Sequence, residues 1–110
     1  MARSHFLLAA VLALPTLGGC AISPFGLSAK ECLTRVMYFE SNRSSAEGML
    51  AVGTVVMNRV DDRKFPHSVC GVVGQRNQFA SGVLWNSMSE GSSLKLARRM
   101  ADKVLRGYRH

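Results

Sequence analysis

One carboxylate in the sequence stands where a catalytic acid could work. Glu40 lies in the stretch YFESNRSSAEG, at the end of an apolar segment with helical spacing and directly before a polar loop. Four-residue steps from Cys32 through Val36 to Glu40 place it near the face of a helix that should be buried. Burial and the negative C-terminal end of the helix would both favour the protonated acid, the form that a general acid needs. The alternatives are a glutamate that turns outward, or one that pairs with Arg43.

No other grouping of side chains predicts a reaction centre. His5, His67 and His110 are scattered along the chain, and no spacing of His, Cys, Asp or Glu matches a metal site. Neither a metal nor a cofactor is expected.

The N-terminal stretch MARSHFLLAAVLALPTLGGC has the features of an export signal. Its apolar run is too short to span a bilayer as a mature helix. Residues 1–19 are predicted to be a lipoprotein signal peptide, because small residues directly before Cys20 favour lipidation of that cysteine. Residues 20–27 would then be a tether and residues 28–110 one domain. An ordinary signal peptide with a chance cysteine is the alternative. Because Ala21 rather than Asp follows Cys20, we expect a periplasmic protein lipid-anchored at the outer membrane.

Two cysteines remain if lipid occupies Cys20. An even pair in an exported chain permits a disulfide, so Cys32 and Cys70 are predicted to be bridged. The bridge would stabilise a small domain by about 4 kcal/mol in the chain-entropy description. Two buried free thiols are the alternative.

The chain is basic, which bears on its partners. Its formal net charge is +7, and loss of Arg3 with the signal leaves 13 − 7 = +6. A basic exported protein fits an anionic surface such as cell wall or membrane lipid. Export argues against nucleic acid as a partner, and a solvated basic surface is the alternative.

Two helices are predicted in the first half of the domain. The first should begin after Ser28, which has the spacing of a capping box, and end at Glu40. The second should begin at Ser44 or Ser45 and run through an almost wholly apolar segment to Asn58, as the buried central helix. β-branched residues in that segment make a strand the alternative.

The second half predicts a short element, a loop and an amphipathic helix. HSVCGVVGQ is either a helix capped by Ser68 or a short strand, and RNQFASG is a loop. The last helix, about residues 92–106, carries a basic face made by Lys95, Arg98, Arg99, Lys103 and Arg106. This face could hold an anionic polymer or lipid headgroups, and a solvated surface is again the alternative.

Five short motifs follow one another between about Cys32 and Ala80. Glu40 and its neighbours come first, then the pair Glu47-Gly48, then VVMNRV, FPHSVCGVV and QFA. In this order they resemble the signatures of the SleB-type cell wall hydrolases, the group named for spore cortex-lytic enzymes. The resemblance implies a small, mainly helical, lysozyme-like α+β domain. It also implies cleavage of the β-1,4 bond between N-acetylmuramic acid and N-acetylglucosamine in peptidoglycan.

The resemblance also implies roles for individual residues. Glu40 would be the catalytic acid, and Gln78 and Phe79 would line the glycan cleft. Arg59, with Asn58, would hold the junction between helix and loop. Domains of the family continue past the last helix, so this chain is expected to be incomplete at its C-terminus relative to them.

A single catalytic carboxylate is expected, although most glycosidases use two. The other candidates, Glu47, Asp61, Asp62 and Glu90, have no comparable apolar setting. One carboxylate suffices if the 6-hydroxyl of the muramic acid attacks and leaves a 1,6-anhydro product, as in a lytic transglycosylase. Non-enzymatic alternatives are a peptidoglycan-binding lipoprotein and a cationic structural lipoprotein at the membrane.

Overall fold

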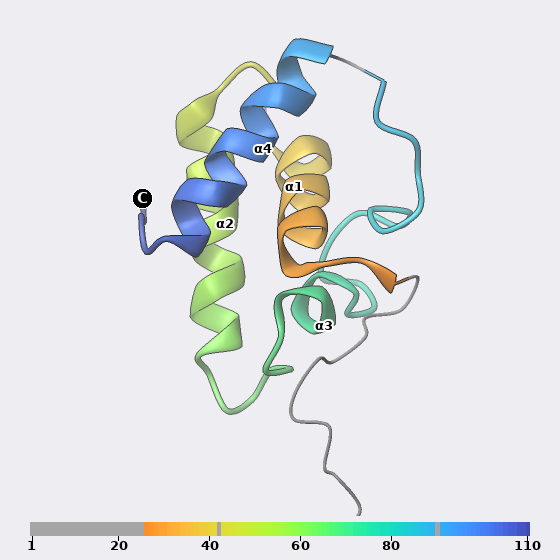
Figure 1. Ribbon diagram of the computed structural model, residues 1–110. Helices are drawn as coiled ribbons and strands as arrows, with labels where there is room; N and C mark the ends of the chain where they lie inside the picture. The colour runs from red at the N-terminus through yellow and green to blue at the C-terminus, as the bar shows by residue number, and fades with distance from the viewer. Residues whose placement is uncertain (1–25, 42, 90) are drawn as a thin grey trace, which may run out of the picture.

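The computed structural model describes residues 26–41, 43–89 and 91–110, which form a bundle of helices (Figure 1). The helices are α1 (Ala29–Glu40), α2 (Ala46–Val60), α3 (Val69–Val73) and α4 (Gly91–Leu105). α1, α2 and α4 pack against one another, and the short α3 lies below the beginning of α1 in Figure 1. The described residues form no strand. The prediction of a mainly helical domain is therefore confirmed, whereas its β component is not.

Serine caps begin the first three helices. The side chain of Ser28 accepts a hydrogen bond from Glu31 N at 3.1 Å. Ser45 accepts one from Gly48 N and Ser68 accepts one from Gly71 N, each at 3.0 Å. Each cap satisfies a backbone N–H that the first turn of a helix leaves without an internal partner. The second and third elements are thus helices, and the strand alternatives are wrong.

The core fills the space between α1, α2 and α4. Its largest fully buried side chains are Leu33, Val36, Met37, Tyr38, Met49, Val56, Val72 and Val104. The three helices come closest at Gly53 of α2. A Cβ atom there would clash with the Met37 side chain of α1 and would lie 2.9 Å from Cγ2 of Val104 in α4. Glycine is required at this position by space, and its backbone is ordinary helix.

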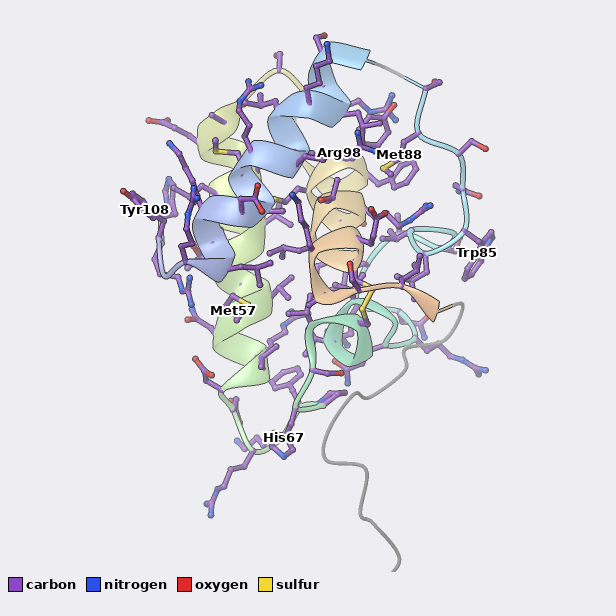
Figure 2. All side chains as sticks on the ribbon, in the orientation of Figure 1. Met57, His67, Trp85, Met88, Arg98 and Tyr108 are labelled. Atoms are coloured by element: carbon purple, nitrogen blue, oxygen red, sulfur yellow. A yellow bond between two sulfur atoms is a disulfide. The ribbon has the colours of Figure 1, made fainter. Side chains whose placement is uncertain are left out.

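The structure joins Cys32 of α1 to Cys70 of α3 by a disulfide, the pair expected from the sequence. The Cα atoms are 5.3 Å apart, and 38 residues separate the two cysteines. Both side chains are buried in the core. The bridge, visible as a yellow bond in Figure 2, therefore fixes α3 against the beginning of α1.

The predicted signal peptide, Cys20 and most of the tether lie outside the described residues, so their assignments stay predictions. Leu27, at the end of the tether, packs partly buried against the core. Within the part of the chain that the structure describes, no helix is long and apolar enough to cross a membrane.

Candidate active site

Glu40 is the last residue of α1 and its side chain is exposed. The prediction that it lies on the buried face of the helix is therefore wrong. Each residue advances a helix by about 100°, so eight residues carry Glu40 about 80° round the axis from Cys32. Cys32 and Val36 are fully buried, but by the end of the helix this row of side chains has rotated out of the core.

The carboxylate of Glu40 is nevertheless held in place. Its Oε1 accepts a hydrogen bond from the backbone N–H of Ala80, which lies 40 residues further along the chain. Arg43, the other partner considered, lies with its guanidinium 4.5 Å from the centroid of the Tyr38 ring. The hydrogen bond between Glu40 and Ala80 joins the end of α1 to the segment that follows α3.

That segment forms a pocket beside Glu40. The pocket has a volume of about 480 Å³ and is lined by residues 73–77 and 79–85. Ala80 belongs both to this lining and to the hydrogen bond with Glu40. The carboxylate therefore stands at the edge of a cavity large enough for part of a sugar chain.

The structure separates the two residues that were expected to line a cleft. Phe79 lines the pocket and is partly buried against the core, whereas Gln78 is exposed and does not belong to the lining. Arg59 lies with its guanidinium 5.3 Å from the ring centroids of both Phe65 and Phe79. These contacts agree with the junction role expected for Arg59. They join the end of α2 to the loop after α2, which contains Phe65, and to the loop after α3, which contains Phe79.

Sequence reasoning missed three residues that shape the pocket. Arg35 of α1 donates from Nη1 to the carbonyl of Asn86 at 2.8 Å and reaches that of Val83 at 3.5 Å. Gln75 lines the pocket, and its buried Oε1 has no hydrogen-bond partner among the described residues. Trp85 lines the pocket and is 63% exposed. The sole tryptophan of the chain, in a segment predicted to contain a loop, is the feature of the sequence that could have indicated this site.

The other carboxylates that the structure describes do not line the pocket. Residues 73–77 and 79–85, which line the pocket, include no Asp or Glu. Glu47 is exposed in the first turn of α2, and Asp62 accepts a hydrogen bond from Lys64 N at 2.9 Å. Glu90 lies outside the described residues. Among the described residues, no group of three or more His, Cys, Asp or Glu side chains could hold a metal ion. Among the described residues, Glu40 is therefore the carboxylate that contacts the lining of the pocket.

Comparisons with known proteins place these features in context. The family described as Cell Wall Hydrolase matches residues 43–110, a span that begins three positions after Glu40. The catalytic domain of the germination-specific lytic transglycosylase SleB from Bacillus anthracis is similar in structure, with 26% identity and a TM-score of 0.61 over 78% of this chain and 70% of that chain. The catalytic domain of the Bacillus cereus SleB protein has 26% identity and a TM-score of 0.58 over 84% of this chain and 72% of that one. The comparison with curated proteins finds no match.

Proposed function

The chain belongs to the cell wall hydrolase family, and from this premise we propose that it cleaves the glycan strands of peptidoglycan. The similar structures are SleB catalytic domains, and one of them is described as a lytic transglycosylase, which supports the same class of reaction. The bond to be broken is the β-1,4 link between N-acetylmuramic acid and N-acetylglucosamine. Glu40 serves as the acid and then as the base.

One contact carries the assignment of Glu40. The N–H of Ala80 binds Oε1 of the carboxyl at the edge of the pocket, which leaves Oε2 to give and take the proton. A glycan strand bound in the pocket would cover the Glu40 carboxyl and exclude water from the reacting atoms. The Glu40 carboxyl, which the sequence led us to expect in the core, would thus be buried by bound substrate.

The reaction proceeds in two proton transfers. Glu40 first donates its proton to the glycosidic oxygen, the bond from C1 of the muramic acid to that oxygen breaks, and the glucosamine leaves with a 4-hydroxyl group. The 6-hydroxyl of the same muramic acid then attacks C1 and forms a 1,6-anhydro ring. The Glu40 carboxylate takes the proton of that hydroxyl and is ready for another cycle. No second carboxylate is required, which is consistent with the lack of Asp and Glu among the described residues that line the pocket.

The test compares two substitutions that each remove one carboxylate. Purified sacculi are incubated with the full chain, and the released muropeptides are identified by chromatography and mass. General acid–base catalysis contributes about 100-fold to 10,000-fold, so Glu40→Gln should lower the cleavage rate by that factor. Products ending in 1,6-anhydro-muramic acid would identify a transglycosylase.

Glu47→Gln is the matched control. Glu47 is exposed in the first turn of α2, where a negative charge stabilises the helix by about 0.3–1 kcal/mol. Its loss should leave cleavage within about twofold of the parent. A Glu47→Gln variant as impaired as Glu40→Gln would indicate a two-carboxylate mechanism. Glu40→Gln cleaving as fast as the parent would remove Glu40 from the mechanism, and sacculus binding without any cleavage would favour the binding lipoprotein.

We also propose that the enzyme works in the periplasm, anchored at the outer membrane by lipid on Cys20. The support is the LGGC stretch with Ala21 after it, and the basic charge of the chain. Metabolic labelling with a fatty acid tests the anchor. The parent should take up label, and a Cys20→Ser variant that takes up as much would contradict the proposal.

A further inference from the structure

Trp85 is the most exposed large aromatic side chain among the described residues. It is 63% exposed, whereas the two residues directly before it, Val83 and Leu84, are only 3% and 6% exposed. Figure 2 shows Trp85 at the outer edge of the segment that follows α3, pointing away from the bundle. The segment is thus anchored by its aliphatic side chains and presents its tryptophan to solvent.

The backbone around Trp85 is held firmly. The carbonyl of Gly82 accepts hydrogen bonds from Trp85 N at 3.1 Å and from Asn86 N at 2.7 Å. Gly82 has a φ of +88°, which favours glycine. From the bundle side, Arg35 Nη1 binds the Asn86 carbonyl at 2.8 Å. A side chain on such a turn keeps its position before a ligand arrives, which lowers the entropic cost of binding.

The pocket beside the indole combines apolar and polar groups. Phe79 and Leu84 contribute apolar surface, and Gln75 contributes a carboxamide whose buried oxygen has no partner among the described residues. Buried polar atoms in proteins almost always have a hydrogen-bond partner. A ligand that donates a hydrogen bond to Gln75 from a hydroxyl or an amide N–H would supply one.

From these observations we propose that Trp85 and the pocket form a carbohydrate subsite, in which one pyranose ring of the glycan stacks on the indole. This inference rests on the proposed function, and it adds the position at which the protein binds the glycan strand. A pyranose presents C–H groups on its faces and hydroxyl or amide groups at its rim, which suits an aromatic ring beside a few polar groups. Ala80 lines the pocket and donates a hydrogen bond to Glu40. A pyranose bound in the pocket would therefore lie next to the glycosidic bond that Glu40 cleaves.

The sole tryptophan makes the subsite directly observable. Soluble glycan strands freed of their peptide stems are titrated into the Glu40→Gln variant, which binds without cleaving. A ring covering the indole should shift tryptophan emission to shorter wavelength, and the shift should saturate. An emission spectrum that stays unchanged while sedimentation shows glycan binding would overturn the subsite.

Substitutions give a second, independent measurement. Trp85→Ala should weaken glycan binding about tenfold and raise KM by a similar factor with little change in kcat, and Trp85→Phe should recover part of the affinity. Tyr108→Ala is the matched control, because Tyr108 is a comparably exposed aromatic (59%) at the opposite edge of Figure 2. It should bind glycan as tightly as the parent. Equal losses in both variants would contradict a specific subsite, as would a loss in Trp85→Ala that is matched by a lower melting temperature.

The outcomes separate this inference from the proposed function. Cleavage that depends on Glu40 but is accompanied by no change in emission overturns the subsite alone. A saturable shift in emission without cleavage by the parent supports the subsite and contradicts the proposed reaction. An emission shift caused by anionic lipid vesicles, with none caused by glycan, would assign Trp85 to a lipid surface and overturn the subsite.

Discussion

The helical bundle and the segment between α3 and α4 are held together by different forces. In the bundle, buried apolar side chains from α1, α2 and α4 decide the positions of the helices. In residues 74–89 only Gly82, Val83 and Leu84 are buried. Polar contacts with α1 hold the rest of the segment, through Glu40 at Ala80, Arg35 at Asn86 and Tyr38 at Ser89 N, and Phe79 and Met88 add partly buried contacts with the core.

Because of this difference, we expect the bundle to determine the stability of the domain and the segment to determine the shape of the candidate site. The bundle buries most of the apolar surface and positions the end of α1, whereas the segment supplies the pocket. A substitution in the bundle should lower the free energy of unfolding and affect cleavage only through the fraction folded. A substitution in the polar contacts should loosen the pocket and leave the bundle largely intact. The four experiments below test that separation, starting with the largest effect.

Removing the disulfide should have the largest effect, because it joins α1 of the bundle covalently to α3, the helix after which the segment begins. Replacing Cys32 and Cys70 together by Ala should lower the free energy of unfolding by about 4 kcal/mol, since the unfolded chain loses the constraint on a loop of this length. Urea unfolding with and without reductant measures the change, and the double variant should not respond to reductant. Mass measurement of the parent before and after reduction is the control. Two free thiols in material produced in an oxidising compartment would contradict the bridge.

Gly53 and Gly48 of α2 differ in the space available for a side chain, because only Gly53 lies where α1, α2 and α4 meet. Gly53→Ala should destabilise the domain toward the upper end of about 1–3 kcal/mol, because the new methyl group meets Met37 and Val104. Gly48→Ala is the matched control in the same helix. Its Cβ would lie at an ordinary 3.4 Å from Ser45 Oγ, so it should be neutral or stabilising by up to about 1 kcal/mol. Thermal unfolding of both variants measures the difference, and equal stabilities would mean that the helices do not meet at Gly53.

Loss of the arginine that holds the segment should affect the pocket more than the bundle. Arg35→Met keeps the apolar stem and removes the hydrogen bonds to the Asn86 and Val83 carbonyls, at a cost of about 1.5 kcal/mol. Hydrogen exchange should accelerate at the amides of Trp85 and Asn86 while the amides of α2 stay protected. Arg98→Met, at an exposed arginine of α4, is the control and should change neither. Uniform acceleration over the whole domain would show that the two regions are not separable.

A surface ion pair of the bundle should contribute least. Lys30 Nζ lies 3.0 Å from the Asp102 carboxylate, and the two side chains are 44% and 45% exposed. Lys30→Ala should therefore lower the free energy of unfolding by less than about 1 kcal/mol. The effect should shrink further in high salt, which screens exposed charges. Urea unfolding at low and high salt measures both, and a salt-independent loss above this range would indicate that Lys30 packs against the bundle.

The helices could be predicted from the sequence because their signals are local. Ser28, Ser45 and Ser68 lie within three residues of the N–H groups that they cap, and the motif series correctly indicated the family. The exposure of Glu40 was predicted wrongly, because four-residue spacing drifts round a helix and the core ends before α1 does. The pocket was predicted only in part, since Phe79 lines it as expected whereas Gln78 does not. It depends on contacts such as Glu40 with Ala80 and Arg35 with Asn86, across 40 and 51 residues, and no local pattern records them.

The disulfide between α1 and α3 has a consequence for the survival of the molecule in a compartment that contains proteases. The turn after α2 is exposed from Asp61 to Lys64, so it is the kind of surface where proteases first cut a folded chain. A cut between Arg63 and Lys64 divides the domain into one piece that ends with α2 and one that begins before α3. Glu40 belongs to the first piece and the pocket to the second. Because Cys32 and Cys70 are bonded across that cut, the two halves of the candidate site stay in one molecule, which separates into fragments only under reducing conditions.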